Sequence, residues 1–290
     1  MRTLYVYKDA KGWSAQIAKA AAKKKDVKVV LFYDAATVPA GAEYFVRMDQ
    51  QGDKRDVCKR VVAELHDKGC VGIPTMEEAH WYDNKLAQYA ALSQWLPETR
   101  IITSVDDQVA ELTFPFISKS SEGASSANVR VICTEQQAKD EAKSVFVKND
   151  MTLKYGRKQE DYLYWQDMIP NDGTYRVTVT LGYVWGYYRK NDPKTGLVAF
   201  PAQGHQLDIA NADDKAVMEL GWEMARSNGT EWMAFDVIKD SRDGKLYCLE
   251  MSSAWPHKKD IEMGCTMWKK DGDEWSDSGL KGRDLMGLLV

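Results

Sequence analysis

The chain has 290 residues, with 39 Lys and Arg against 43 Asp and Glu, and a formal net charge of −4 at pH 7. Because acidic and basic residues are interspersed and nearly balanced, the composition argues against a protein that binds nucleic acid or anionic membranes by neutralising phosphates. The length and the 44% hydrophobic content predict a globular protein of roughly two domains.

The sequence also excludes several other classes. No apolar run approaches the roughly 18 residues that a membrane span needs, and the apolar stretch near the start is too short for a signal peptide. We therefore expect a cytoplasmic protein. The five cysteines lack CxxC spacing, so reduced core thiols are favoured over zinc or disulfides. With four histidines, a His-rich metal site is excluded.

Residues 1–80 alternate strand-like and helix-like patterns, which predicts a small, mostly parallel βαβ sheet. The expected strands lie at residues 3–7, 27–33 and 44–48, and the expected helices at 14–25 and 53–68. The first strand-to-helix turn, residues 9–14, lacks the GxGxxG pattern, so we do not expect a dinucleotide-binding domain.

Residues 81–160 are predicted to form a small central α+β domain. Just before them, Thr75 and Glu78 have the spacing of a capping box, and Thr134 has the features of a second helix cap. The expected elements are a helix at 83–95, a strand at 101–103, a helix begun by Ser104, strands at 115–119 and 128–133, and a helix after Thr134. A loop of small residues occupies positions 120–126.

Residues 161–290 are rich in strand patterns and are predicted to form a C-terminal domain with an antiparallel sheet. Strands are expected at 162–166, 175–181, 183–189, 232–238 and 246–251, with a helix from Asn211 to about Gly229. The turn before the last strand is expected to be a three-residue loop, residues 242–244, with Gly244 in the left-handed conformation. Such a loop pairs residues of the two strands whose numbers sum to 486.

Two acidic side chains meet in this last predicted hairpin. In that register Asp236 faces Glu250, and Ser252 lies one step along on the same face. Two opposed carboxylates repel each other unless a cation or a shared proton intervenes. One interpretation is a pair of solvated acids on the rim of the sheet; the other is a site for a hard cation such as Mg²⁺.

Four basic residues carry similar alternatives. Lys119 ends an apolar strand and enters the small-residue loop, which suits either a phosphate cradle or an ordinary surface loop. Lys85, early in a helix, taken alone is typical of a solvated lysine. Arg176 and Arg189 interrupt β-favouring strands, where each could pair with a carboxylate or hold an anionic substrate.

Taken in order, these segments resemble the ATP-grasp superfamily, and within it the branch of ribosomal glutamate ligases and glutathione synthetases. The match runs over residues 81–256 and is carried by segments 83–87, 96–99, 114–119, 164–169, 174–177, 187–189, 234–237 and 248–256. Each segment is loose by itself, but their ordered combination is fairly specific.

The resemblance implies an ATP-grasp fold with three domains: an N-terminal βαβ domain at 1–80, a small central domain at 81–160 and a C-terminal domain at 161–290. It implies that ATP is bound by Lys85, Lys119, Gly123, Ser125, Gln166, Asp167, Met168 and Ile169. It implies a metal site of Asp236, Glu250 and Ser252 for Mg²⁺, with Mn²⁺ as an alternative, and Arg176 and Arg189 as catalytic arginines.

This sequence departs from the family pattern in three places. The usual Glu-x-Asn of the metal strand is Glu250-Met251-Ser252 here, which weakens the third metal ligand. The loop at 120–126 retains one glycine, Gly123, where the family has more. Residues 200–205 replace the family's substrate-side segment, so the resemblance does not identify the substrate.

The function implied is an ATP-dependent carboxylate–amine ligase that forms an amide through an acyl phosphate and releases ADP and phosphate. Its partners would be small-molecule or peptide carboxylates and amines, with no nucleic acid and no membrane. The alternative, motivated by Ser252 and the glycine-poor loop, is a non-catalytic ATP-binding or scaffold protein with the same fold. The sequence does not indicate the oligomeric state.

Overall fold

A computed structural model describes residues 1–9, 12–107, 113–121, 129–152, 159, 161–191, 204–253 and 264–290. They form two compact units, which we call unit 1 and unit 2. Unit 1 contains Met1–Tyr82, Gly173–Asp236 and Met251–Val290; unit 2 contains Asp83–Asp172 and Val237–Glu250. The predicted division into three domains stays a prediction.

The N-terminal part of unit 1 is a parallel sheet with the strand order β2-β1-β3-β4. Its elements are β1 Arg2–Tyr7, α1 Trp13–Ala21, β2 Val27–Phe32, the short η1 Ala35–Thr37, β3 Glu43–Phe45, α2 Gly52–Asp67, β4 Val71–Ile73 and α3 Met76–Trp81. Buried Leu4 and Val6 alternate along β1, as in a strand with one face in a core. The predicted βαβ arrangement is confirmed.

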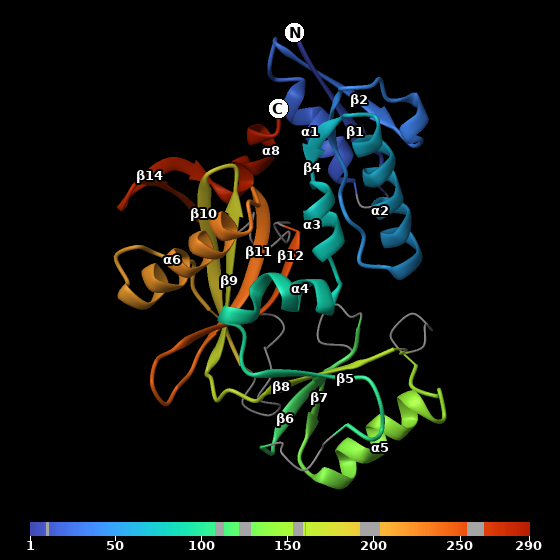
Figure 1. The fold of residues 1–290 in the computed structure, drawn as a ribbon. Coiled ribbons are helices and arrows are strands. Elements are labelled where there is room, and N and C mark those ends of the chain that lie inside the picture. The colour runs from blue at the N-terminus through green and yellow to red at the C-terminus, as the bar shows by residue number, and fades with distance from the viewer. Residues whose placement is uncertain are drawn as a thin grey trace. The chain divides into compact units, whose positions relative to one another are not determined.

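The larger sheet of unit 1 has the order β12-β11-β9-β10-β13-β14. Its elements are β9 Gly173–Thr180, β10 Tyr183–Lys190, α6 Ala212–Ser227, β11 Trp232–Lys239, β12 Leu246–Ser253, β13 Thr266–Asp271, β14 Glu274–Lys281, η4 Gly282–Asp284 and α8 Leu285–Leu288. The ends of β11 and β12 nearest their connecting turn belong to unit 2. Helix α6 lies beside β9 and β10 (Figure 1), and a Cβ at Gly221 would meet Val177 at 2.6 Å, so only glycine permits this approach.

The two sheets of unit 1 share one hydrophobic core. The rings of Phe45 on β3 and Trp232 on β11 contact edge to face, with centroids 5.8 Å apart. Leu4, Val6 and Ile17 belong to the same buried cluster as Trp185 and the C-terminal residues Leu285 and Leu289. A second buried cluster of unit 1 lies within its first 82 residues. The first 82 residues are therefore packed into this unit rather than attached by a linker.

Glu78 makes a polar connection inside the same unit. One carboxylate oxygen, Oε1, accepts from the backbone N–H groups of Glu231 at 3.1 Å and Trp232 at 3.0 Å, and from the Thr230 hydroxyl. The other accepts from the N–H of Thr75 at 3.0 Å, and the Thr75 hydroxyl accepts from the N–H of Glu78, which confirms the predicted capping box. Burial raises the pKa of Glu78, although these four donors oppose the shift.

Unit 2 contains a third sheet, with the order β5-β8-β6-β7 and antiparallel pairing. Its elements are α4 Lys85–Leu92, η2 Ser93–Trp95, β5 Thr99–Ile102, β6 Phe116–Lys119, β7 Val129–Ile132, α5 Glu135–Phe146 and β8 Leu163–Asp167. Its core contains Phe116, Trp165 and the α5 residues Ala138 and Ala142. The unit is α+β, as expected for the small domain, but its sheet includes β8, a strand that the sequence assigns to the C-terminal domain.

Three local expectations are wrong. Ser104 does not begin a helix in the described residues: at 103–107 the Asp107 carboxylate accepts from the N–H groups of Thr103 and Ser104 and holds a turn. The strand expected at 44–48 ends at Phe45. The last hairpin has a four-residue loop, because Asp240 bonds with both Gly244 and Lys245.

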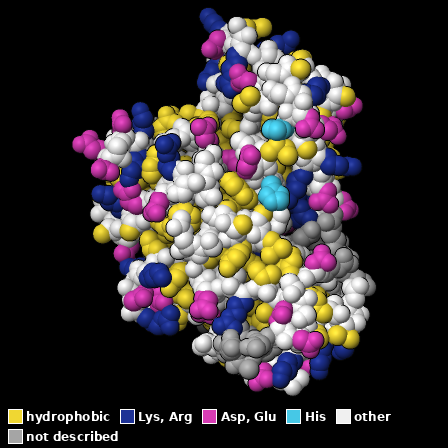
Figure 2. All heavy atoms as spheres, in the orientation of Figure 1, with side chains coloured by type: hydrophobic (Ala, Val, Ile, Leu, Met, Phe, Trp, Pro, Cys, Tyr) yellow, Lys and Arg dark blue, Asp and Glu magenta, His cyan; other side chains and the backbone are white. Residues whose placement is uncertain are grey.

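The surface agrees with the balanced composition. On the face drawn in Figure 2, Lys and Arg side chains are interspersed with Asp and Glu. Among the described residues, no helix combines the length and the apolar character that crossing a bilayer requires.

Candidate active site

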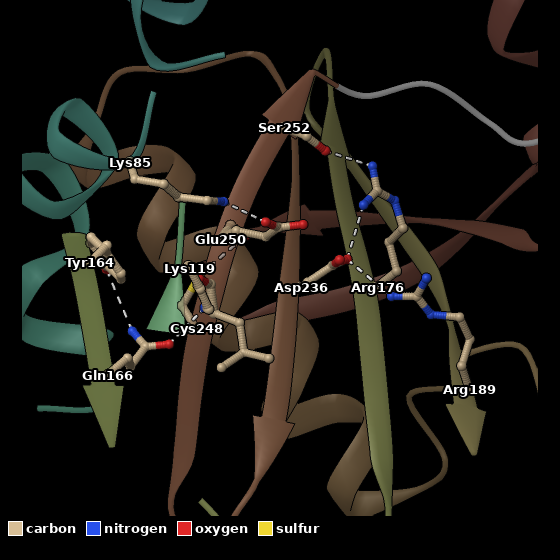
Figure 3. Close-up of polar contacts among 11 residues, drawn as sticks. Lys85, Lys119, Tyr164, Gln166, Arg176, Arg189, Asp236, Cys248, Glu250 and Ser252 are labelled. Carbon is tan, nitrogen blue, oxygen red and sulfur yellow. Dashed lines mark hydrogen bonds and ion pairs between the residues drawn. The ribbon is translucent and has the colours of Figure 1, made fainter. Parts of the chain in front are cut away.

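In unit 2, Lys85 is held against Glu250. Lys85 is the first residue of α4, whose start is fixed by the Asn84 side chain accepting from the N–H of Ala87 at 3.2 Å. Its side chain is buried, and its Nζ lies 2.6 Å from Oε2 of Glu250 on β12 (Figure 3). Glu250 is 38% exposed, so this carboxylate is open to solvent while the ammonium is not.

Lys119 reaches the neighbouring residue of the same strand. Lys119 is the last residue of β6, and its buried Nζ donates to the carbonyl of Leu249 at 3.1 Å and to Oε1 of Gln166 at 2.7 Å. Gln166 on β8 is oriented in turn by Nε2, which donates to the Thr99 hydroxyl at 3.1 Å. Two lysines from different elements therefore converge on consecutive residues of β12.

The electrostatics of this lysine pair follow from burial and from Glu250. Burial alone would lower the pKa of Lys85, but the adjacent Glu250 carboxylate outweighs it and raises that pKa. Tyr164, opposite Lys119 in the sheet, has its pKa raised to about 12 by burial. At neutral pH the Lys85 ammonium and a neutral Tyr164 phenol therefore belong to this cluster.

The segment predicted to hold adenine, residues 166–169, begins in β8 and runs past its end. Gln166 is buried, Met168 is 43% exposed and Ile169 is buried. The backbone N–H of Asp167 donates to the carbonyl of Glu98 at 2.9 Å, and burial together with the nearby Glu98 raises the pKa of Asp167. Gly123 and Ser125, the predicted phosphate-loop residues, lie outside the described residues.

In unit 1, Arg176 connects two strands through its guanidinium. Nη1 donates to Oδ1 of Asp236 on β11 at 2.9 Å, and Nη2 donates to Oγ of Ser252 on β12 at 2.7 Å (Figure 3). Arg189 on β10 adds a second cation, with Nη2 3.3 Å from the same Oδ1. We call Arg176, Arg189, Asp236 and Ser252 the arginine cluster.

The sheet register explains why both arginines reach Asp236. Arg176 pairs with Tyr187 across β9 and β10, and Arg189 lies two residues further along β10, hence on the same face. Burial alone would raise the pKa of Asp236, but the two guanidinium groups outweigh it and lower that pKa. Asp236 is therefore ionised at neutral pH.

The structure thus assembles the predicted residues as two networks, one in each unit. Lys85, Lys119, Gln166 and Glu250 belong to the first, and Arg176, Arg189, Asp236 and Ser252 to the second. The predicted pairing of Asp236 with Glu250 assumed a three-residue loop. Because the loop has four residues, the turn gives no support for that pairing. In the described chain, Asp, Glu, His and Cys nowhere form a group of three or more suited to hold a metal ion.

Sequence reasoning missed the residues that orient the lysines. Thr99 and the Leu249 carbonyl complete the contacts of Gln166 and Lys119. A backbone carbonyl carries no signal in a sequence. Tyr164 could have been found, because it lies two residues from Gln166 in one strand and shares its face.

Chemically, the two networks provide ammonium groups, guanidinium groups and two carboxylates. Each network by itself has groups of both kinds: lysines and arginines bind phosphate oxygens, and carboxylates are ligands for Mg²⁺. The buried Nε of Arg189 has no partner within the described residues, so this arginine retains a donor for a further ligand.

Solved structures with the same fold are known. A RimK domain ATP-grasp protein from Sphaerobacter thermophilus matches with a TM-score of 0.56 and 16% identity, over 87% of this chain and 90% of that chain. N5-carboxyaminoimidazole ribonucleotide synthetase from Thermotoga maritima matches with a TM-score of 0.60 and 13% identity, over 90% and 71%. The ATP-grasp ligase PsnB, complexed with minimal precursor, Mg and ADP, matches with a TM-score of 0.57 and 12% identity, over 88% and 90%.

These likenesses confirm the predicted fold class. This chain has the ATP-grasp fold, with a parallel N-terminal sheet, a small α+β sheet and a six-stranded C-terminal sheet. No protein-family model matches the sequence, and no curated protein does either.

Proposed function

We propose that this protein is an ATP-dependent carboxylate–amine ligase that releases ADP and phosphate. The observation that carries the proposal is the convergence of Lys85 and Lys119 on residues 249 and 250 of β12. Two buried lysines beside a carboxylate are suited to a nucleoside triphosphate and its cation. An ion pair that only stabilised the fold would need Glu250 and a single lysine.

The chemistry follows from the poor reactivity of a carboxylate toward amines. In the proposed reaction the substrate carboxylate oxygen attacks the γ-phosphorus of ATP, the bond to the bridging oxygen breaks, and ADP leaves. The amine then attacks the acyl phosphate and displaces inorganic phosphate. Phosphoryl transfer of this kind requires mainly positioning and neutralisation of charge.

Lys85 and Lys119 would hold the phosphate oxygens, with Gln166 keeping Lys119 oriented. Residues 167–169 would provide the adenine site together with Gln166, and Gly123 and Ser125 would contact the phosphates from the loop. Burial of both lysines reduces screening by water, which strengthens their interaction with phosphate.

Asp236 and Glu250 would be the principal ligands of a divalent cation. Carboxylate oxygens fit Mg²⁺ or Mn²⁺, and the lowered pKa of Asp236 keeps this ligand ionised. When bound, the cation would neutralise charge on the β- and γ-phosphates. Glu250, being 38% exposed, can exchange its contact with Lys85 for such a cation without opening a buried core.

Arg176 and Arg189 would act on the substrate side. The guanidinium groups would stabilise the acyl phosphate and the oxyanion of the tetrahedral intermediate. The buried, unpartnered Nε of Arg189 supports this role, because it offers a donor that no described residue uses.

The related structures support both the reaction class and a broad range of substrates. PsnB was determined with a minimal precursor, Mg and ADP. Another structure of this fold is D-alanine–D-alanine ligase from Bacillus anthracis, which matches at 12% identity with a TM-score of 0.54. For this chain we propose a small-molecule or peptide carboxylate and an amine as substrates.

The test is a screen of paired carboxylates and amines for ADP release, with the pair that gives turnover then assayed for an amide product. ADP formation that requires both substrates and yields the amide is the expected result. ADP formed at the same rate without an amine would contradict the ligase proposal.

A non-catalytic ATP-binding protein is the second candidate. It is favoured by Ser252, which stands where the family has Asn and whose hydroxyl is already bonded to Arg176. Tight ATP binding by calorimetry, with no ADP released from any pair in the screen, would support this function over the ligase.

A further inference from the structure

Arg176, on β9, contacts both strands that carry the proposed metal ligands of unit 1, first β11 and beyond it β12. Its Nη1 bonds to Asp236 on β11 and its Nη2 to Ser252 on β12, so one planar group connects both. The Arg176 and Asp236 side chains are 13% and 14% exposed. A guanidinium held by two partners in so little solvent has a fixed position and a permanent charge.

The contacts of Asp236 limit what this carboxylate can bind. Both arginines contact the same oxygen, Oδ1, at 2.9 Å and 3.3 Å. Among the described residues, Oδ2 is therefore the atom that Asp236 can offer to a cation. Sites with two metal ions about 3.5–4 Å apart need ligands placed to hold both ions. Asp236 has one oxygen for that purpose.

Ser252 is engaged in the same way. Its Oγ accepts from Nη2 of Arg176 at 2.7 Å, which is a short, charge-assisted hydrogen bond. A divalent cation on the same oxygen would lie next to the Arg176 guanidinium, and the two positive charges would repel each other. The Ser252 hydroxyl therefore serves as a hydrogen-bond acceptor for Arg176.

The charge of each network also argues against a second divalent cation. In unit 1, two guanidinium groups face the single carboxylate of Asp236; in unit 2, two buried lysines accompany Glu250. Each network has more positive than negative charge before any metal binds. A second divalent cation would add to this excess, whereas a fixed guanidinium already supplies a positive charge.

We propose that Arg176 takes the place of a second divalent cation, that Ser252 orients Arg176 instead of a metal, and that this chain binds one divalent ion with its nucleotide. The inference rests on the proposed function, because it concerns the metal and nucleotide of the same site. It corrects the expectation that Ser252 is a third metal ligand.

The primary test counts Mn²⁺ on the wild-type protein, so it does not depend on a variant that folds. The protein is saturated with a non-hydrolysable ATP analogue, and bound Mn²⁺ is measured by electron paramagnetic resonance during titration. One Mn²⁺ per chain is expected. Two Mn²⁺ per chain would overturn the inference and leave the ligase proposal standing. Analogue bound without any Mn²⁺ would overturn the inference too, and failure of the analogue to bind would contradict the proposed ATP site itself.

Variants separate a metal ligand from a positioning residue. Ser252→Ala is expected to change the Kd for Mn²⁺ less than about threefold, whereas Asp236→Asn weakens it at least about tenfold. Ser252→Ala should also raise the KM of the carboxylate substrate, and Ser252→Thr should restore it, because Thr retains the hydroxyl that accepts from Arg176. Equal loss of Mn²⁺ affinity in Ser252→Ala and Asp236→Asn, with both folded by circular dichroism, would overturn the proposal.

Discussion

The ammonium of Lys85 lies 2.6 Å from the carboxylate of Glu250, although 165 positions separate these residues in the chain. This contact places a buried cation from the start of α4 on the strand that carries one of the proposed metal ligands. In the same unit, Lys119 donates to Leu249, the residue before Glu250.

If the two lysines hold phosphates, each is needed for nucleotide affinity. Lys85→Met and Lys119→Met should each raise the Kd for ATP about tenfold or more, since a hydrogen bond to a charged group contributes roughly 1.5–3 kcal/mol. Isothermal titration calorimetry measures this change. Lys148→Met, at an exposed position of the same unit, is the matched control and should leave the Kd unchanged. Wild-type affinity in both lysine variants would exclude them from the site.

Glu250 is expected to contribute to turnover more than to folding, because its side chain is 38% exposed. Glu250→Gln should lower the rate of substrate-dependent ADP release by about 100-fold or more, through loss of a charged metal ligand. The control, Glu274→Gln, removes an exposed carboxylate from β14. Comparable rates in the two variants would refute the assignment of Glu250 as a ligand.

Asp236 gives a prediction for the pH dependence of stability. Its pKa is lowered in the folded state, so its ion pairs stabilise the fold fully above the ordinary pKa of about 3.9 and are lost as the pH falls through the folded value. Asp236→Asn should therefore be less stable than wild type by roughly 3 kcal/mol at pH 7, because two arginines lose their counter-charge. The difference should shrink below about pH 4.

Urea unfolding of both proteins between pH 3 and 7 measures this difference. Asp273→Asn, in the exposed turn between β13 and β14, serves as the reference for a carboxylate outside the arginine cluster. A gap between wild type and Asp236→Asn that stays constant with pH would show that the arginines do not depend on the charge of Asp236.

Glu78 is predicted to stabilise unit 1. Glu78→Ala removes the acceptor for Thr230, Glu231 and Trp232 and leaves buried donors unsatisfied, which should lower the free energy of unfolding by about 2–4 kcal/mol. Glu77→Ala, at the exposed neighbouring position, should change it by less than about 0.5 kcal/mol. Equal stability of the two variants by thermal or urea unfolding would disprove this role.

Local signals were sufficient for much of the fold. The capping box of Thr75 and Glu78, the cap at Thr134 and the left-handed Gly244 were predicted, because each depends on residues within a few positions. The length of the loop in the last hairpin was not predicted correctly, because three- and four-residue loops contain the same kinds of turn residue. Ser104 resembles a helix cap, but Asp107 uses the local N–H groups for a turn.

The candidate site was predictable in its residues and less so in its contacts. The ordered motifs identified Lys85, Lys119, Asp236 and Glu250. The hydrogen bond from Arg176 to Ser252, in contrast, joins residues 76 positions apart on β9 and β12, which have β11 between them. The donors to the Glu78 carboxylate from Thr230, Glu231 and Trp232, at the start of β11, are likewise a long-range feature. Such contacts are decided by the packing of the sheets and leave no local pattern.

The shared core of unit 1 has a consequence for how the polypeptide acquires its structure. Phe45 contacts Trp232, and Leu4 lies in the same core as Leu289, so this unit cannot be completed until residue 289 has been synthesised. Contacts so distant in sequence slow folding, because long loops must close before the contacts form. Most of unit 2, residues 83–172, is made in between and can order earlier on the ribosome. During synthesis the buried cluster of residues 32–82 can therefore form first, while Leu4 and Phe45 stay exposed until their later partners are available.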